Sequence, residues 1–196
     1  MVERQLRRRG IDDERVLKAM GEVPRERFLA PDMRDRAYRD GAVAIEEGQT
    51  MSQPWIVACM TSLLGLRGHE RVLEVGTGSG YAAAVLSRCC AEVVTIERHP
   101  ALACRAAAVL DELGYANVEV RTGDGTLGAP DRAPFGGALV TAVAEERPPP
   151  AVIEQLEQGA ALVCPVRDGD GEHLTLYRGE RQERVVPVRF VPLVSG

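Results

Sequence analysis

The residues best suited to bind a ligand are the three glycines of the stretch VLEVGTGSGY, which begins at Val72. The short apolar run 72–75 predicts a buried strand of a parallel sheet. Gly76, Gly78 and Gly80 then allow a sharp turn and a close approach of the backbone to a ligand. Good helix formers follow over 82–86, so the stretch predicts a strand, a glycine turn and a helix.

The spacing of this turn favours S-adenosyl-L-methionine over a dinucleotide. Unpaired N–H groups and the positive end of the helix dipole attract an anionic group. The pattern here is G-x-G-x-G, whereas dinucleotide sites use G-x-G-x-x-G to hold a diphosphate. S-adenosyl-L-methionine has no phosphate, and its carboxylate suits the turn amides while its ammonium suits Glu74. The alternative is a plain strand–helix turn with structural glycines.

Two further acidic residues follow predicted strands. Strand 92–97 ends in Glu97, which is placed to accept hydrogen bonds from both ribose hydroxyls. Strand 118–122 is followed by Gly-Asp-Gly, where Asp124 could accept from an adenine amino group. Each acid alone could be a helix cap or a solvated carboxylate. Together with the glycine turn, they resemble a class I methyltransferase.

The composition indicates one ordinary globular domain. The chain has 196 residues, a net charge of -5 and no basic segment long enough to suggest nucleic-acid binding. Its apolar runs are too short to span a bilayer, and its start shows no apolar signal segment. The five cysteines and three histidines are scattered, which argues against a metal site and fits reduced thiols. We therefore expect a cytoplasmic monomer without nucleic-acid or membrane partners.

Residues 1–53 divide into a helical part and an irregular part. Residues 1–37 are predicted to be α-helical, with acids at one helix start where the dipole favours them. Residues 38–53 show little periodicity and are rich in hydroxyl and amide groups. Pro54 suits a first helical position, so Thr50 and Ser52 lie just before a helix. Ser52 could either cap this helix or act in chemistry, and the pattern alone leaves both open.

The remaining chain alternates between helices and strands. We predict a helix over 100–113, a strand over 137–141, a helix over 151–156 and a strand over 161–166. A hairpin turn at 168–171 should join a closing antiparallel pair of strands, 173–178 and 184–191.

The segment GQTMSQP, from Gly48 to Pro54, together with the glycine stretch, resembles the protein-L-isoaspartate O-methyltransferase family. The resemblance covers nearly the whole chain, including VPRERF from Val23 and VRFVPLV from Val188. It implies an α/β fold, namely a Rossmann-like doubly wound mixed sheet with helices on both faces and an N-terminal helical extension. It also implies a single domain, with a helical lead-in and substrate loop over 1–53 and a cofactor-binding core over 54–196.

The family resemblance implies carboxyl O-methylation of L-isoaspartyl and D-aspartyl residues in damaged proteins, which initiates repair. The cofactor would be S-adenosyl-L-methionine and the product S-adenosyl-L-homocysteine. A carboxylate has a pKa near ~4 and is already ionised at neutral pH, so alignment and exclusion of water matter more than a general base. The implied catalytic residues are Ser52 and Thr50, whose hydroxyls can orient a carboxylate. The implied cofactor residues are Glu74, Gly76, Thr77, Gly78, Ser79, Glu97, Asp124 and Gly125. The implied substrate residues are Ala44, Ile45, Gln49 and Val191, and no metal is implied.

The chain departs from the usual family pattern mainly on the substrate side. Ala44 and Glu46 stand where a proline and a glycine are usual, and Glu145 and Arg167 are also off-pattern. Glu46 motivates one alternative, a relative that methylates aspartate in a dedicated biosynthetic peptide, because added negative charge should repel acidic peptides. A non-catalytic module that only binds the cofactor is a second alternative, and the intact hydroxyl pair argues against it. A nucleic-acid methyltransferase has less support, since no basic surface is visible.

Overall fold

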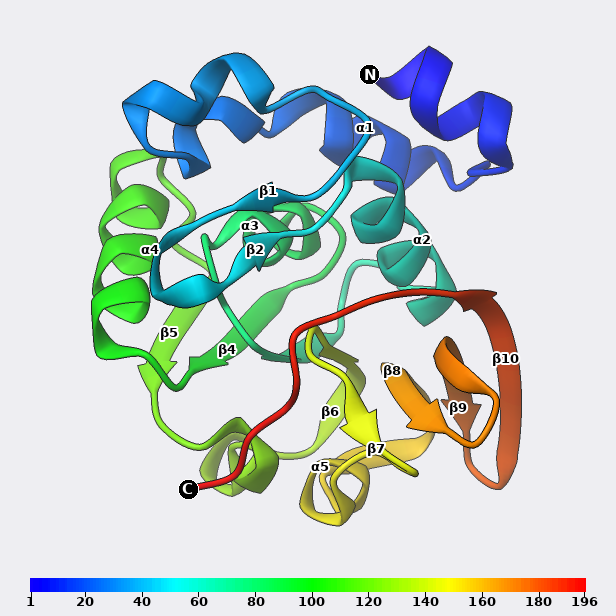
Figure 1. The fold of residues 1–196 in the computed structure, drawn as a ribbon. Coiled ribbons are helices and arrows are strands. Elements are labelled where there is room, and N and C mark those ends of the chain that lie inside the picture. Colours follow the sequence, from blue (N-terminus) through cyan, green and yellow to red (C-terminus); the bar gives the residue numbers. More distant parts are fainter.

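The computed structural model describes residues 1–196 as one central sheet with helices packed against it (Figure 1). The strand order is β10-β9-β8-β6-β3-β4-β5, and β7 pairs with β8. The strands from β5 to β8 in this order run parallel, whereas β9 and β10 add an antiparallel edge. The predicted fold class, a doubly wound mixed sheet, is confirmed. The main-sheet strands are β3 (Arg71–Val75), β4 (Glu92–Glu97), β5 (Val118–Thr122), β6 (Phe135–Val140), β7 (Ala144–Glu145), β8 (Leu156–Asp168), β9 (Gly171–Arg178) and β10 (Arg181–Pro187).

The connections reverse direction beside β3, and this reversal creates the site. The chain passes from β3 to β4 and β5 on one side, then returns to place β6 against the other edge of β3. In such sheets a crevice opens at the carboxyl ends of the two strands that flank the reversal. Here those ends are Val75 of β3 and Val140 of β6, which are paired in register.

Apolar side chains cover both faces of the sheet because successive residues of a strand point to opposite sides. Val72 belongs to the larger buried cluster, whereas Leu73 and Val75 belong to the smaller one. The larger cluster includes side chains of α2 and α3, and the smaller one includes Val152 of α5. The helices are α1 (Glu14–Glu22), α2 (Pro54–Leu64), α3 (Tyr81–Ser87), α4 (Pro100–Glu112) and α5 (Pro150–Glu154).

The N-terminal segment is helical, but only α1 within it is an α-helix. Asp13 caps α1 by accepting from the backbone N–H groups of Arg15 and Val16. The prediction of a continuous α-helical character over 1–37 is wrong elsewhere, where the turns are π (Val2–Leu6) or 3-10 (Arg7–Arg9, Arg25–Phe28 and Pro31–Arg36). Prolines 24 and 31 cannot donate a backbone hydrogen bond, so the helical path breaks into short turns there.

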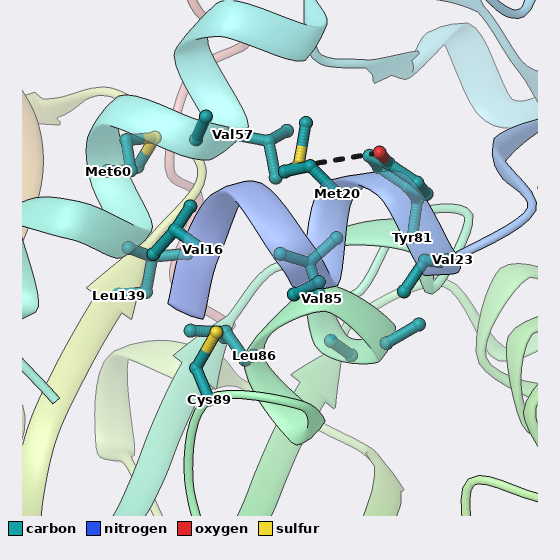
Figure 2. Close-up of a cluster of buried hydrophobic side chains, with 14 of the residues drawn as sticks. Val16, Met20, Val23, Val57, Met60, Tyr81, Val85, Leu86, Cys89 and Leu139 are labelled. Atoms are coloured by element: carbon teal, nitrogen blue, oxygen red, sulfur yellow. Dashed lines mark hydrogen bonds between the residues drawn. The ribbon is translucent and has the colours of Figure 1, made fainter. Parts of the chain in front are cut away.

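Side chains of α1 anchor this segment to the core. Figure 2 shows them packed among residues of α2, α3 and β6 in the larger apolar cluster. The hydroxyl of Tyr81 donates to the sulfur of Met20 at 3.5 Å. The labelled cluster residues are Val16, Met20, Val23, Val57, Met60, Tyr81, Val85, Leu86, Cys89 and Leu139.

Two segments differ from the sequence prediction near the carboxyl edge of the sheet. The irregular segment before α2 contains a short hairpin of β1 (Val43–Ala44) and β2 (Thr50–Met51), joined by the 3-10 turn Glu46–Gly48. The last strand was predicted to reach residue 191 but ends at Pro187. Beyond it, the chain crosses the carboxyl edge of the sheet (Figure 1), where Val143 exchanges backbone hydrogen bonds with Val191 and Leu193, both 2.8 Å.

Candidate active site

The glycine turn connects β3 to α3 at the bottom of a cleft. Gly76 has φ +97°, a conformation that side chains other than glycine rarely adopt. A Cβ atom at Gly76 would lie 2.3 Å from the Thr141 hydroxyl oxygen, so the position has no room for a side chain. That hydroxyl donates to the Gly76 carbonyl at 2.6 Å. The end of β6 therefore holds the turn in place.

Glu97 closes the turn from the neighbouring strand. It is buried and lines the cleft at the carboxyl end of β4. One carboxylate oxygen accepts the N–H of Gly78 at 2.8 Å, and the other accepts the N–H of His99 at 3.0 Å. A carboxylate has about four acceptor positions, so each oxygen can still accept one hydroxyl. This geometry suits the predicted role toward two ribose hydroxyls.

Glu74 lies beneath the turn and does not line the cleft. It is fully buried, and its Oε2 accepts from the Thr95 hydroxyl at 2.6 Å. The Thr95 hydroxyl in turn contacts the Thr77 hydroxyl at 2.6 Å, whereas the Oε1 atom of Glu74 has no partner. Burial, with a smaller contribution from the nearby Glu97 charge, raises the pKa of Glu74 to about 8. Glu74 is therefore a buried acid that supports the turn. Because Glu74 does not line the cleft, its carboxyl group is not exposed there to a ligand ammonium group, as the sequence had suggested it would be.

Asp124 also lies outside the cleft lining, although its neighbour Gly125 belongs to it. One oxygen of Asp124 accepts the N–H and the hydroxyl of Thr126, and the other accepts the N–H of Gly196 at 2.9 Å. The hydroxyl bond is the main reason that the pKa of Asp124 lies below its usual value. Asp124 thus caps the 3-10 turn Gly125–Leu127, and a role toward adenine stays a prediction.

Thr50 and Ser52 lie where two hollows meet. The cleft above the glycine turn encloses about 960 Å³, part of it open to solvent. A second hollow of about 820 Å³ lies beside it, and both Thr50 and Ser52 line the two hollows. The helix-capping alternative for Ser52 is not supported, because the residue that caps α2 is Gln53 and no side chain bonds to the helix start. The other residues of the second hollow are Ala42, Gln53, Ile56, Pro187, Val188, Arg189 and Phe190.

The structure brings together most of the predicted site residues. Of the predicted substrate residues, two line the cleft, while Ala44 is exposed on β1 and Ile45 only approaches the turn near Gly78. The predicted residues in the cleft wall are Gln49, Thr50, Ser52, Gly76, Thr77, Gly78, Ser79, Glu97, Gly125 and Val191.

Sequence reasoning missed several other residues of the cleft wall. Arg98 and His99 follow Glu97 directly, and Thr141 follows β6 next to the glycine turn, so their positions in the sequence carried a usable signal. Residues 192–194 also line the cleft, but the sequence pattern extended the last strand too far to show this.

The negative charge of Glu46 is neutralised within the protein. Its carboxylate forms an ion pair with Arg105 of α4, and Glu46 does not line either hollow. The next residue, Glu47, has φ +57° and an oxygen 3.8 Å from the Nδ1 atom of His99. The loop between β1 and β2 is therefore tied to α4 at the rim of the cleft.

The site contains no arrangement suited to metal chemistry, since no three His, Cys, Asp or Glu side chains gather closely enough to hold an ion. Four of the five cysteines are buried and all are free thiols. None of the helices is both long and apolar enough to cross a membrane.

Comparison with known proteins identifies the family. The model of the protein-L-isoaspartate(D-aspartate) O-methyltransferase family matches residues 1–196. The chain belongs to this family. A family relative from Anaeromyxobacter sp. (strain Fw109-5), named protein-L-isoaspartate O-methyltransferase 2, is 52% identical over 202 aligned positions, which cover 100% of this chain and 82% of the relative. The family predicted from the motifs is confirmed.

Solved structures agree with this family assignment. A structure named protein-L-isoaspartate O-methyltransferase matches with a TM-score of 0.86 and 29% identity, covering 100% of this chain and 66% of that longer chain. A putative family structure from Plasmodium falciparum, solved in complex with S-adenosyl-L-homocysteine, matches with a TM-score of 0.81 and 22% identity. That match covers 97% of this chain and 95% of the other, and it shows the shared fold.

Proposed function

We propose that this protein transfers a methyl group from S-adenosyl-L-methionine to the carboxylate of L-isoaspartyl and D-aspartyl residues in damaged proteins, and so initiates their repair. The observation that carries the proposal is the position of Thr50 and Ser52. Both residues line the cleft above the glycine turn and also the second hollow. A peptide carboxylate in the second hollow and a cofactor in the cleft would meet at these hydroxyls. Family membership supports the same reaction.

The cleft fits the cofactor on its own geometry. The glycine turn lines the cleft, and the backbone N–H groups of Thr77 and Ser79, which make no hydrogen bond within the protein, suit a carboxylate. Glu97 retains acceptor capacity for ribose hydroxyls, and Val75 and Ile96 give the same cleft an apolar wall. When bound, S-adenosyl-L-methionine supplies a methyl group activated by a sulfonium.

The protein's own residues would bind, orient and shield the reactants. An isoaspartyl carboxylate is ionised at neutral pH and needs no base to become nucleophilic. Hydroxyl donors at Thr50 and Ser52 can fix the orientation of the carboxylate. Because no proton has to be removed, this orientation contributes more to the reaction rate than proton transfer would. Met51 and residues 191–194 line the cleft, and their apolar surfaces would help to exclude water once both reactants are bound.

The alternative substrate, an aspartate in a dedicated biosynthetic peptide, loses its main support. It rested on the charge of Glu46, and that charge is paired with Arg105. We further propose that the whole chain acts as one domain and as a cytoplasmic monomer on protein substrates, without nucleic-acid or membrane partners. The net charge of -5 and the free thiols support this.

The decisive experiment compares two synthetic peptides that differ only in one linkage, isoaspartyl or ordinary aspartyl. Methyl transfer from labelled S-adenosyl-L-methionine is expected with the isoaspartyl peptide alone. Calorimetry on the same preparation measures cofactor binding. Transfer to neither peptide, with the cofactor bound, would overturn the proposed substrate and direct the search to another carboxylate.

A further inference from the structure

Arg25 is a buried cation without a carboxylate partner. Its side chain is fully inaccessible to solvent, yet no Asp or Glu lies within ion-pair distance of it. Its Nε donates to the carbonyl of Ala37 at 2.6 Å, and its Nη2 donates to the carbonyl of Ser52 at 2.7 Å. Its Nη1 is buried and has no hydrogen-bond partner. A guanidinium in this state keeps an uncompensated positive charge inside the protein.

Arg25 contacts the active site on two sides. One contact is the backbone of Ser52, whose side chain lines both hollows. The other is the ring of Tyr81, which lines the cleft and lies 4.6 Å from the guanidinium carbon. Figure 2 shows Tyr81 at the edge of the apolar cluster between α1 and α3. The apolar surroundings leave little water to screen this charge.

Burying an unpaired charge costs free energy, and stacking on an aromatic ring recovers only part of it. Burial lowers the pKa of Arg25, but an arginine side chain stays protonated in proteins. A negative charge that arrives near Ser52 would offset this cost. The substrate of the proposed reaction brings such a charge, because its reacting group is a carboxylate.

We propose that Arg25 is a charge-recognition residue for the substrate, whose buried positive charge behind Ser52 attracts the anionic carboxyl group to the Thr50 and Ser52 hydroxyls. This inference rests on the proposed function. The charge balance of the reaction predicts which kinetic constant Arg25 changes. Methyl transfer from a sulfonium to a carboxylate consumes one positive and one negative charge and yields a neutral ester and a neutral thioether. A nearby cation therefore favours the bound carboxylate more than the transition state, so Arg25 should lower KM without raising kcat.

The test compares Arg25→Gln, which removes the charge, with Arg25→Lys, which keeps it but loses the planar fork. For Arg25→Gln we expect KM for the isoaspartyl peptide to rise roughly tenfold or more, with kcat within about twofold of the wild type. Arg25→Lys should keep KM within about threefold. The matched control is Arg27→Gln on the same 3-10 turn, where the arginine pairs with Glu112 at the surface. Its KM should not change.

A second readout separates charge recognition from simple support of the fold. The competitor is the same peptide with the free isoaspartyl carboxylate replaced by a primary amide. The wild type should bind the carboxylate peptide more tightly than the amide peptide, and Arg25→Gln should reduce this preference roughly tenfold. Cofactor affinity, measured by calorimetry, should stay unchanged. A merely structural role would instead lower kcat and cofactor affinity in both Arg25 variants and leave the preference intact, and that result would overturn the inference.

Failure of the proposed function and misfolding of a variant can both be told apart from the results above. If the wild type fails to methylate the isoaspartyl peptide, the proposed function fails and the fault does not lie with Arg25. If Arg25→Gln does not fold, Arg25→Met, which also removes the charge, takes its place: a roughly tenfold loss of the carboxylate preference supports the inference, and an intact preference overturns it.

Discussion

Replacing Glu74 by glutamine should remove a large part of the pH dependence of this protein's stability between about pH 4.5 and pH 8. The Glu74 carboxyl is fully buried, and burial raises its pKa from 4.5 to about 8. Between these values the unfolded chain releases this proton while the native protein keeps it. The native state therefore binds more protons, and its free energy of unfolding falls as the pH rises.

The size of the effect follows from the two pKa values. Their difference of about 3.5 pH units corresponds to at most about 5 kcal/mol, at ~1.4 kcal/mol per pH unit. Glutamine has a similar shape, can accept the Thr95 hydroxyl bond and carries no charge at any pH. Near pH 4.5 the variant and the wild type should have similar stability. At pH 8 the variant should be more stable by up to about 5 kcal/mol.

The assay is urea unfolding, followed by circular dichroism at constant ionic strength, at several values from pH 5 to pH 8. The informative quantity is the difference in unfolding free energy between variant and wild type, because other groups titrate equally in both. The exposed Glu157, replaced by glutamine, controls for the chemical change itself. A difference that is the same at pH 5 and pH 8 would show that Glu74 is ionised in the native protein, and the reasoning from burial would be refuted.

Three further predictions concern the site. Ser52→Ala should cut turnover roughly 100-fold and leave cofactor affinity nearly intact, measured by single-turnover kinetics and calorimetry; unchanged turnover would remove Ser52 from the chemistry. Asp124→Ala should weaken cofactor binding and also lower stability by about 1 kcal/mol through the lost cap, and wild-type affinity in calorimetry would contradict its cofactor role. Gly76→Ala should lower both the melting temperature and cofactor affinity, because its Cβ would lie 2.3 Å from the Thr141 hydroxyl oxygen; a wild-type melting curve would refute this.

Two departures from the family pattern acquire a physical explanation in the structure. Glu46 pairs with Arg105, and Glu145 pairs with Arg167 at 2.5 Å. In each case a charge that looked unusual in the sequence meets an opposite charge far along the chain. These exposed pairs add little to stability, but they explain why the substitutions need not alter the substrate side.

Sequence reasoning failed where the outcome depended on distant contacts. The last strand was predicted to reach residue 191, but β10 ends at Pro187, and after one further backbone bond from Val188 to Glu172 of β9 the chain bonds to Val143 instead. The hairpin of β1 and β2 was missed because each strand has only two residues, too few to show periodicity. No sequence pattern indicates that Arg25 is a buried cation without a carboxylate partner, because burial depends on how the whole chain packs.

The sequence by itself determined the glycine turn between β3 and α3, the acid that ends β4, the hydroxyl pair before α2 and the family. These features arise from residues within a few positions of one another, whose backbone preferences and spacing act locally. Only the tertiary structure decided that Glu74 lies beneath the turn rather than in the cleft, that Asp124 serves as a cap, and that Arg25 stands uncompensated behind Ser52. Those outcomes depend on which side chains are excluded from water when separate elements pack together, and no local pattern records that.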